Sequence, residues 1–156
     1  MVSPDEVKDR VGQAINMLRT RDGFLLEHRA HERSITHKLA EYLQSEFPDY
    51  NVDCEYNLHG SLPKRLLREC EGNDQELVYP DIVVHQRGND NSNLLVVEAK
   101  PRRQSNVPEC DRIKLEEFTK LDGNYRYQLG LFIGFDGLNE PQLVWFTGGE
   151  PRRPSR

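Results

Sequence analysis

This chain of 156 residues has no long apolar run, few cysteines and no excess of basic residues. No apolar run approaches the roughly 20 residues that cross a bilayer, and the longest runs cover residues 94–97 and 129–135. Cysteine occurs only three times, without the CxxC spacing of a zinc site. Basic residues are outnumbered, at 21 Lys and Arg against 26 Asp and Glu. These scarcities argue against a membrane partner, a disulfide framework and a generally basic coat protein for nucleic acid.

The cysteines and the N-terminal segment bear on the compartment. Cys54, Cys70 and Cys110 are an odd number and predict reduced thiols. The first ten residues are charged and contain no apolar stretch of the kind found in secretory signals. The sequence therefore predicts a cytoplasmic protein.

The length fits one compact domain that needs no structural metal to fold. We expect this domain to cover residues 1–147, because the Gly-, Pro- and Arg-rich residues 148–156 are typical of a flexible tail. The formal net charge of −5 still permits an enzyme that meets a polyanion at one metal-neutralised site.

Hydrophobic periodicity predicts the secondary structure. We expect helices over residues 4–18, 27–47 and 109–121, with a short helix over 62–69. Strands are expected over residues 52–56, 81–85, 93–100, 127–135 and 142–146. This order predicts an α/β fold in which helices flank a central mixed β-sheet.

The most informative residues are Asp81 and the segment Glu98-Ala99-Lys100. Side chains alternate along a strand, so Glu98 and Lys100 share one face. A hairpin with its turn centred near Asp90 places Asp81 opposite Ala99, and a slip of one residue places it opposite Lys100. Either register gathers two carboxylates and an ammonium group at one edge of the sheet.

Such a cluster has a plausible chemistry. Two close carboxylates repel each other unless a cation joins them, and hard oxygen ligands favour Mg²⁺ or Mn²⁺. The carbonyl oxygen of Ala99 can add a ligand, and Lys100 can orient the attacking water. Glu32 continues the apolar stripe of Ile35 and the rest of its helix, so it supplies a third carboxylate. These residue types suit phosphodiester hydrolysis.

Basic residues near this segment are candidates for phosphate contacts. Arg102 and Arg103 directly follow the strand that carries Lys100, and Lys64 with Arg65 precedes the site in sequence. Simpler interpretations stay open for all of these charges. Alternating charges can merely solvate a strand, and Glu32 can be a solvated acid of the first helical turn.

The spacing of these residues is similar to a known pattern. Pro80-Asp81, followed 17 residues later by Glu98-Ala99-Lys100, resembles the PD-(D/E)XK motif of the restriction-endonuclease-like nuclease superfamily. The resemblance covers roughly residues 27–135 and implies a restriction-endonuclease-like core. It also implies that Asp81 and Glu98 ligate the metal, that Lys100 is catalytic, and that Glu32 is the acid on the upstream helix. Segments such as 52–57 and 111–115 resemble small bacterial proteins of unassigned role.

These considerations predict a Mg²⁺- or Mn²⁺-dependent nuclease, acting on DNA rather than RNA and possible as a homodimer. The alternative is a non-catalytic module that binds nucleic acid or a protein through the same fold, which the acidic balance favours somewhat. A third interpretation is a metal-dependent hydrolase of small phosphoesters.

Overall fold

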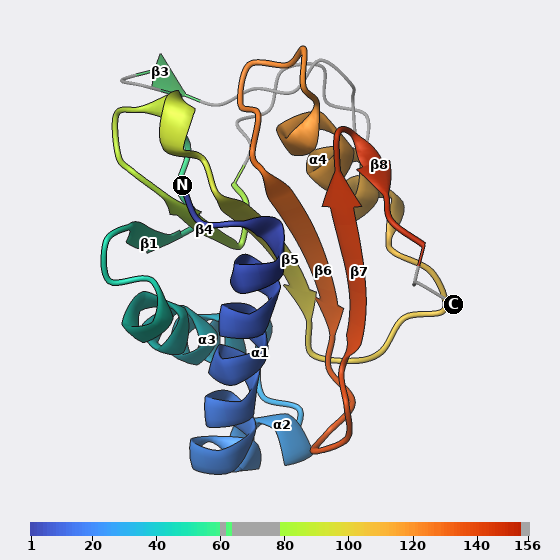
Figure 1. Ribbon diagram of the computed structural model, residues 1–156. Helices are drawn as coiled ribbons and strands as arrows, with labels where there is room; N and C mark the ends of the chain where they lie inside the picture. Colours follow the sequence, from blue (N-terminus) through green and yellow to red (C-terminus); the bar gives the residue numbers. More distant parts are fainter. Residues whose placement is uncertain (60–61, 64–78, 154–156) are drawn as a thin grey trace.

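The computed structural model describes residues 1–59, 62–63 and 79–153 (Figure 1). Within these ranges, six strands form one sheet in the order β1-β4-β5-β6-β7-β8, and two short strands form a separate antiparallel pair. The six strands are β1 (Asn51–Cys54), β4 (Ile82–His85), β5 (Leu95–Lys100), β6 (Leu129–Gly134), β7 (Gln142–Thr147) and β8 (Glu150–Pro151). The separate pair is β2 (Leu58–His59) with β3 (Leu62–Pro63). Only β5 and β6 run parallel, so the sheet is mixed as predicted.

Two long helices and one short helix precede most of the sheet. The first helix, α1 (Pro4–Arg21), begins after Ser3, whose hydroxyl accepts a hydrogen bond from the Glu6 N–H. The expected single helix over residues 27–47 is instead α2 (Gly23–Glu27) followed by α3 (Glu32–Glu46). A left-handed residue, Arg29 with φ of 48°, breaks the chain between them. Glu32 is therefore the first residue of α3 and lies at its exposed end, close to the sheet edge.

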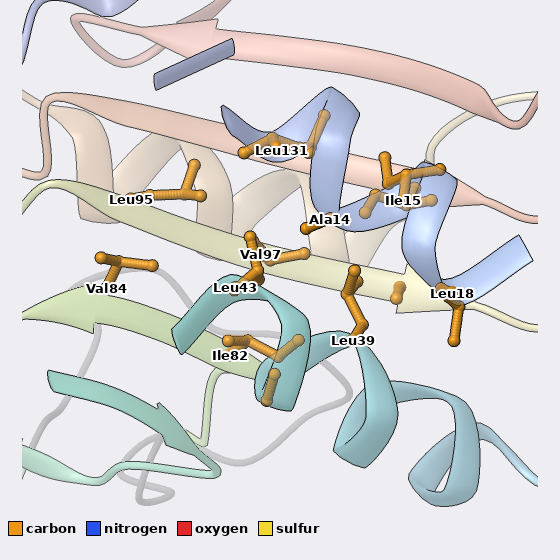
Figure 2. Close-up of a cluster of buried hydrophobic side chains, with 14 of the residues drawn as sticks. Ala14, Ile15, Leu18, Leu39, Leu43, Ile82, Val84, Leu95, Val97 and Leu131 are labelled. Atoms are coloured by element: carbon orange, nitrogen blue, oxygen red, sulfur yellow. The ribbon is translucent and has the colours of Figure 1, made fainter. Parts of the chain in front are cut away.

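Helices cover both faces of the sheet. On one face, α1 and α3 pack against the side chains of alternate strand residues (Figure 2), which include Ile82, Val84, Leu95, Val97 and Leu131. On the other face, α4 (Glu109–Thr119) packs through Leu115 and Phe118. Val83 and Val96 point to this second face. Because side chains alternate, Glu98 and Lys100 also belong to the α4 face.

The β4–β5 register differs by one residue from the register expected. Ile82 pairs with Val97 and Val84 with Leu95. Continued by one step, this register places Asp81 opposite Glu98, where we had expected Ala99 or Lys100. The cause lies in the connection, because Gln86 bridges Asn89 and a 3₁₀ turn, η1 (Asp90–Ser92), then adds residues on the β5 side only.

The parallel pair of strands is connected by a helix. From the end of β5 the chain passes through α4 and returns to β6, which is the crossover that parallel neighbours require (Figure 1). Gly130 of β6 makes this packing possible, because a Cβ there would lie 3.1 Å from Thr119 and 3.3 Å from Leu115 of α4. The last turns of α4 are thereby held close to the sheet face that carries Glu98.

Several expectations about the cysteines, the 62–69 helix and the C-terminal tail need correction. Cys110 is disulfide-bonded, which contradicts the expected reduced thiol and removes this argument for a cytoplasmic location, while Cys54 is a free, exposed thiol. Cys70 and most of the expected 62–69 helix lie outside the described residues, and residues 62–63 form β3. Residues 150–151 of the expected tail pair with β7 as β8. In the part of the chain that the structure describes, no helix is long and apolar enough to cross a membrane.

Candidate active site

The candidate site lies where β4 begins and β5 ends, between the first turns of α3 and α4. Asp81 immediately precedes β4, and its Oδ2 accepts a hydrogen bond from the Ala99 N–H at 2.8 Å. This bond ties the Asp81 carboxylate to β5, next to Glu98. The carbonyl oxygen of Ala99 as a further ligand stays a prediction.

Glu98 is the most deeply buried acid of the site, with 1% of its surface exposed. Burial, reinforced by the nearby Asp81 carboxylate, raises the pKa of Glu98 well above its usual value. The Lys114 ammonium, with Nζ 3.6 Å from Glu98 Oε1, offsets this only in part. That same oxygen has no hydrogen-bond partner. Glu98 is therefore a carboxylate held in the interior at an energetic cost.

Lys100 connects the two helices across the end of β5. Its Nζ lies 3.7 Å from Glu32 Oε2 and 3.4 Å from Asp111 Oδ2. Burial opposes the charge of Lys100, but the carboxylates of Asp111, Glu32 and Asp81 outweigh it and raise its pKa. Lys100 therefore stays protonated and fixed between α3 and α4.

Glu32 reaches the site from the opposite layer of the fold. The N–H of Arg33 donates to His31 Nδ1, which starts α3 and presents Glu32 at the end of the sheet. Burial and the Asp81 carboxylate raise the pKa of Glu32, while Lys100 lowers it. The structure therefore brings Glu32 together with Asp81 and Lys100, and its role in the site stays a prediction.

Two residues of the site were not given a role by sequence reasoning. Asp111 is 4% exposed, and burial raises its pKa although Lys100 and Lys114 act against this. Asp111 and Lys114 each lie one helical turn before a core residue of α4, Leu115 and Phe118 respectively. That periodicity was the available signal, because it places both charges on the buried side of the helix.

We refer to Glu32, Asp81, Glu98 and Asp111 as the carboxylate cluster. Together with Lys100 and Lys114 it carries four negative and two positive formal charges, which leaves a formal charge of −2. A cavity of about 420 Å³ opens onto its Glu32 and Asp81 side. The cavity is lined further by residues of α3 and of the β1 end, which are His31, Arg33, Thr36, His37, Cys54 and Glu55. The cluster is thus open on its side between α3 and β1.

The donor set can be tested against a divalent cation. Among the residues described, no three His, Cys, Asp or Glu side chains converge closely enough to hold a metal ion as they stand. The chemistry of the donors nevertheless fits Mg²⁺ or Mn²⁺, because all are carboxylates and two buried oxygens, Glu98 Oε1 and Asp111 Oδ2, lack a hydrogen-bond partner. A divalent ion would also cancel the formal charge of −2.

The structure describes two of the four basic residues that were predicted to contact phosphate. Arg102 and Arg103 are exposed and line a separate cavity just beyond Lys100. Lys64 and Arg65 lie outside the described residues. Arg33, which follows Glu32 in α3, has its Nε 3.5 Å from Glu55 Oε1.

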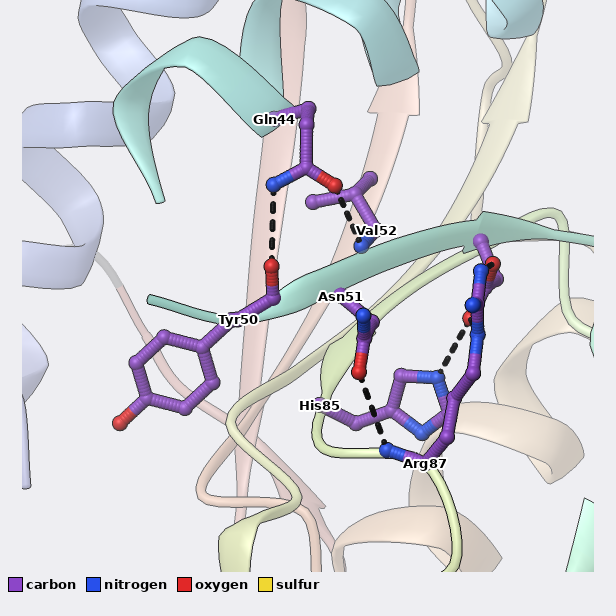
Figure 3. Close-up of polar contacts among 7 residues, drawn as sticks. Gln44, Tyr50, Asn51, Val52, His85 and Arg87 are labelled. Atoms are coloured by element: carbon purple, nitrogen blue, oxygen red, sulfur yellow. Dashed lines mark hydrogen bonds and ion pairs between the residues drawn. The ribbon is translucent and has the colours of Figure 1, made fainter. Parts of the chain in front are cut away.

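A second polar group lies on β1 and β4 (Figure 3). His85 is 3% exposed and its Nε2 lies 2.8 Å from Asp53 Oδ2, while Arg87 Nε donates to the same oxygen at 2.9 Å. The N–H of Arg87 also donates to Asn51 Oδ1 at 3.2 Å. The Asp53 carboxylate is therefore held by His85 and Arg87 rather than simply solvated. These contacts fasten the edge strand β1 to the end of β4.

Asp53→Asn is expected to destabilise the protein by about 1–2 kcal/mol at pH 7, since a charged hydrogen-bond acceptor is lost at a partly solvated site. Burial acts against the Asp53 charge, but the hydrogen bonds from Arg87 and His85 prevail and lower its pKa below 3.8. A lowered folded pKa gives stability above the unfolded value that is lost as pH falls through the folded value. Urea unfolding should therefore show a larger wild-type advantage at pH 7 than at pH 3. An equal difference at both pH values would contradict this, and Asp49→Asn, an exposed acid, serves as the control.

Comparisons of the chain with protein-family models, curated proteins and solved structures find no match. The functional conclusion therefore depends on the geometry and chemistry of the site.

Proposed function

We propose that this protein is a Mg²⁺- or Mn²⁺-dependent nuclease that hydrolyses phosphodiester bonds of nucleic acid, with DNA as the preferred substrate. The observation that carries the proposal is the carboxylate cluster, which has a formal charge of −2 and two buried oxygens, Glu98 Oε1 and Asp111 Oδ2, with no hydrogen bond and only a lysine ammonium 3.4–3.6 Å away. Buried charges of this kind contribute little net stability, because replacing buried ion pairs by well-packed apolar residues is often neutral or stabilising.

The arrangement of β4, β5, α4 and β6 supports a restriction-endonuclease-like core as part of this proposal. Asp81 and Glu98 come from neighbouring antiparallel strands, and Lys100 follows on the same face of β5. This is the pattern on which the resemblance to the PD-(D/E)XK motif was based. The crossover through α4 then adds Asp111 and Lys114 to the same face.

Each residue has a role in the proposed reaction. Asp81 and Glu98 would hold the cation, with Glu32 completing the site from α3. The bound cation would polarise the phosphate and lower the pKa of a water molecule. Lys100 stays protonated beside these groups, so it orients the water and stabilises the negative charge that develops on the phosphate. Asp111 acts as a positioning residue, because it holds the Lys100 ammonium from 3.4 Å.

Asp81→Asn is expected to abolish specific Mn²⁺ binding and metal-dependent cleavage, because an amide oxygen is a weaker ligand and the cluster loses one charge. Isothermal titration with Mn²⁺ measures the first effect. Incubation with plasmid, single-stranded DNA and RNA, with Mg²⁺, Mn²⁺ or EDTA, measures the second. Asp49→Asn is the matched control, since Asp49 is exposed and far along the chain from the cluster. Wild-type protein that binds no Mn²⁺ and cuts none of these substrates would overturn the proposal.

A non-catalytic module is the second candidate, favoured by the two lysines that already pair with the cluster. Lys100 and Lys114 lie 3.4–3.7 Å from its oxygens and compete with a cation for them. In that case nucleic acid would bind equally well in EDTA and Mg²⁺, without any cleavage. The same titration and cleavage experiments distinguish the two functions.

A further inference from the structure

A pocket of about 200 Å³ adjoins the candidate active site at the end of β5. Arg29, Arg102 and Arg103 line it together with one acid, Asp136. Three guanidinium groups against one carboxylate give the pocket a formal charge of +2, in a chain whose net charge is −5. An excess of guanidinium groups over carboxylates in one pocket is typical of sites that bind anions.

The three arginines have no ion-pair partner among the residues that the structure describes. Most other charged side chains near the site are paired, as Lys100 is with Asp111 and Arg33 is with Glu55. Arg29 comes from the turn between α2 and α3, with a left-handed backbone at φ of 48°. Its guanidinium is thus brought to the pocket by the same break in the helix that sets Glu32 at the start of α3.

The loop that carries Arg102 and Arg103 is fixed in place by the neighbouring strands. Gln142 of β7 accepts a hydrogen bond from the Gln104 N–H at 2.9 Å and donates to the Gln104 carbonyl oxygen at 3.0 Å. A Cβ at Gly134 of β6 would lie 2.5 Å from Gln142 Oε1 and 3.3 Å from Arg103 Cα. A side chain at Gly134 would therefore displace the Gln142 amide and crowd the backbone of the loop. The arginines are presented by a prearranged loop, which lowers the entropic cost of binding a ligand.

The pocket includes residues that lie close in sequence to two of the proposed active-site residues. Arg102 follows Lys100 by two residues, so their Cα atoms are at most about 7 Å apart. Arg29 precedes Glu32 by three residues in the same way. Figure 1 shows α2 beside the connection between β6 and β7, and Arg19 of α1 binds the Leu138 carbonyl oxygen of this connection at 2.9 Å. The pocket therefore lies at the end of β5 that carries Lys100, beside the turn that leads into Glu32.

We propose that Arg29, Arg102 and Arg103 form a subsite for a backbone phosphate of a nucleic-acid strand, next to the phosphate that reacts at the carboxylate cluster. Bidentate guanidinium–phosphate hydrogen bonds would fix the strand and its register, without reading its sequence. The strand as ligand rests on the proposed function, while the anion-binding chemistry of the pocket does not. Arg29 is the new member, since sequence reasoning assigned phosphate contacts only to Arg102 and Arg103 in this region.

The test is binding of a fluorescein-labelled single-stranded DNA oligonucleotide, followed by fluorescence anisotropy in EDTA at several salt concentrations. The double variant R29Q/R102Q is expected to bind about tenfold more weakly or worse at low salt. The slope of log affinity against log salt should fall by about 1–2, because up to two phosphate contacts are lost. R152Q removes an exposed arginine outside the pocket and should bind within about twofold of wild type.

Two further probes test whether the pocket binds a backbone phosphate of a strand or free inorganic phosphate. An oligonucleotide with an uncharged methylphosphonate backbone should bind wild type and R29Q/R102Q equally weakly, since the variant removes only the response to charge. Displacement of the charged oligonucleotide by millimolar inorganic phosphate, at constant ionic strength, would show a free-phosphate site and overturn the assignment to a strand. Unchanged affinity and salt slope in R29Q/R102Q, or no binding by wild type, would also overturn it.

The subsite and the proposed activity can fail separately. If R29Q/R102Q loses binding while wild type cleaves nothing with any metal, the subsite stands and the nuclease proposal fails. If wild type cleaves with Mg²⁺ and R29Q/R102Q has an unchanged KM, the nuclease proposal stands and the subsite fails. With both correct, the variant raises KM and leaves kcat at saturating substrate within about twofold of wild type.

Discussion

Lys100→Ala is expected to reduce the rate of metal-dependent cleavage by about 10²–10³-fold, the loss typical of removing one preorganised electrostatic group. Its ammonium lies between Glu32 and Asp111, within 3.4–3.7 Å of their oxygens. Initial rates on plasmid and on single-stranded DNA, at saturating Mg²⁺, measure the effect.

Mn²⁺ affinity, measured beside the cleavage rate, distinguishes a catalytic role of Lys100 from a purely structural one. Removing a positive charge from a cluster of acids should leave Mn²⁺ affinity equal or higher, so cleavage and metal binding should separate in this variant. Lys38→Ala is the matched control, because Lys38 is also a partly exposed lysine paired with an acid, Glu41, at 3.3 Å. Equal rates for wild type, Lys100→Ala and Lys38→Ala would rule out the catalytic role.

Glu98→Gln is expected to stabilise the metal-free protein at neutral pH by about 1–3 kcal/mol, while it eliminates cleavage. The gain follows from removing a buried charge whose Oε1 has no hydrogen-bond partner. Lys114, which is 24% exposed, can turn to solvent when its partner is neutral. Urea unfolding in EDTA measures the free energy of unfolding for both proteins.

The raised pKa of Glu98 makes the stability difference between Glu98→Gln and wild type depend on pH. Burial raises the folded pKa of Glu98 above the usual 4.5, so the folded state binds more protons and wild-type stability falls as pH rises through this interval. The advantage of Glu98→Gln should therefore be absent near pH 4 and full only above the folded pKa. Saturating Mn²⁺ should stabilise wild type, by about 2.7 kcal/mol at 100 times Kd, and not the variant. A variant that is less stable than wild type in EDTA at pH 7 would contradict the interpretation of Glu98 as a costly buried charge.

The sequence supports the central part of the site without knowledge of the fold. Alternation along one strand sets Glu98 and Lys100 on one face, and the apolar strand after Asp81 implies that it pairs nearby. The helical stripe that includes Ile35 likewise points Glu32 toward the sheet. These are local rules of period 2 and period 3.6, which depend only on neighbours in the chain.

Non-local features of the site required the tertiary structure. The exact position of Asp81 opposite Glu98 depends on the 3₁₀ turn after Gln86, a difference of one residue that periodicity does not detect. The break at Arg29 depends on one left-handed residue inside a segment with continuous helical periodicity.

What the sequence determined by itself is therefore most of the long helices and sheet strands, and the side of each on which its charges lie. The tertiary structure decided which of these sides meet. The crossover through α4 brings Asp111 to Lys100, and a close backbone approach at Gly134 turns Arg102 and Arg103 toward Arg29, more than 70 residues away in the sequence. Charge clusters of this kind arise from contacts between distant segments, and such contacts are set by packing of the whole core rather than by any local preference of the chain.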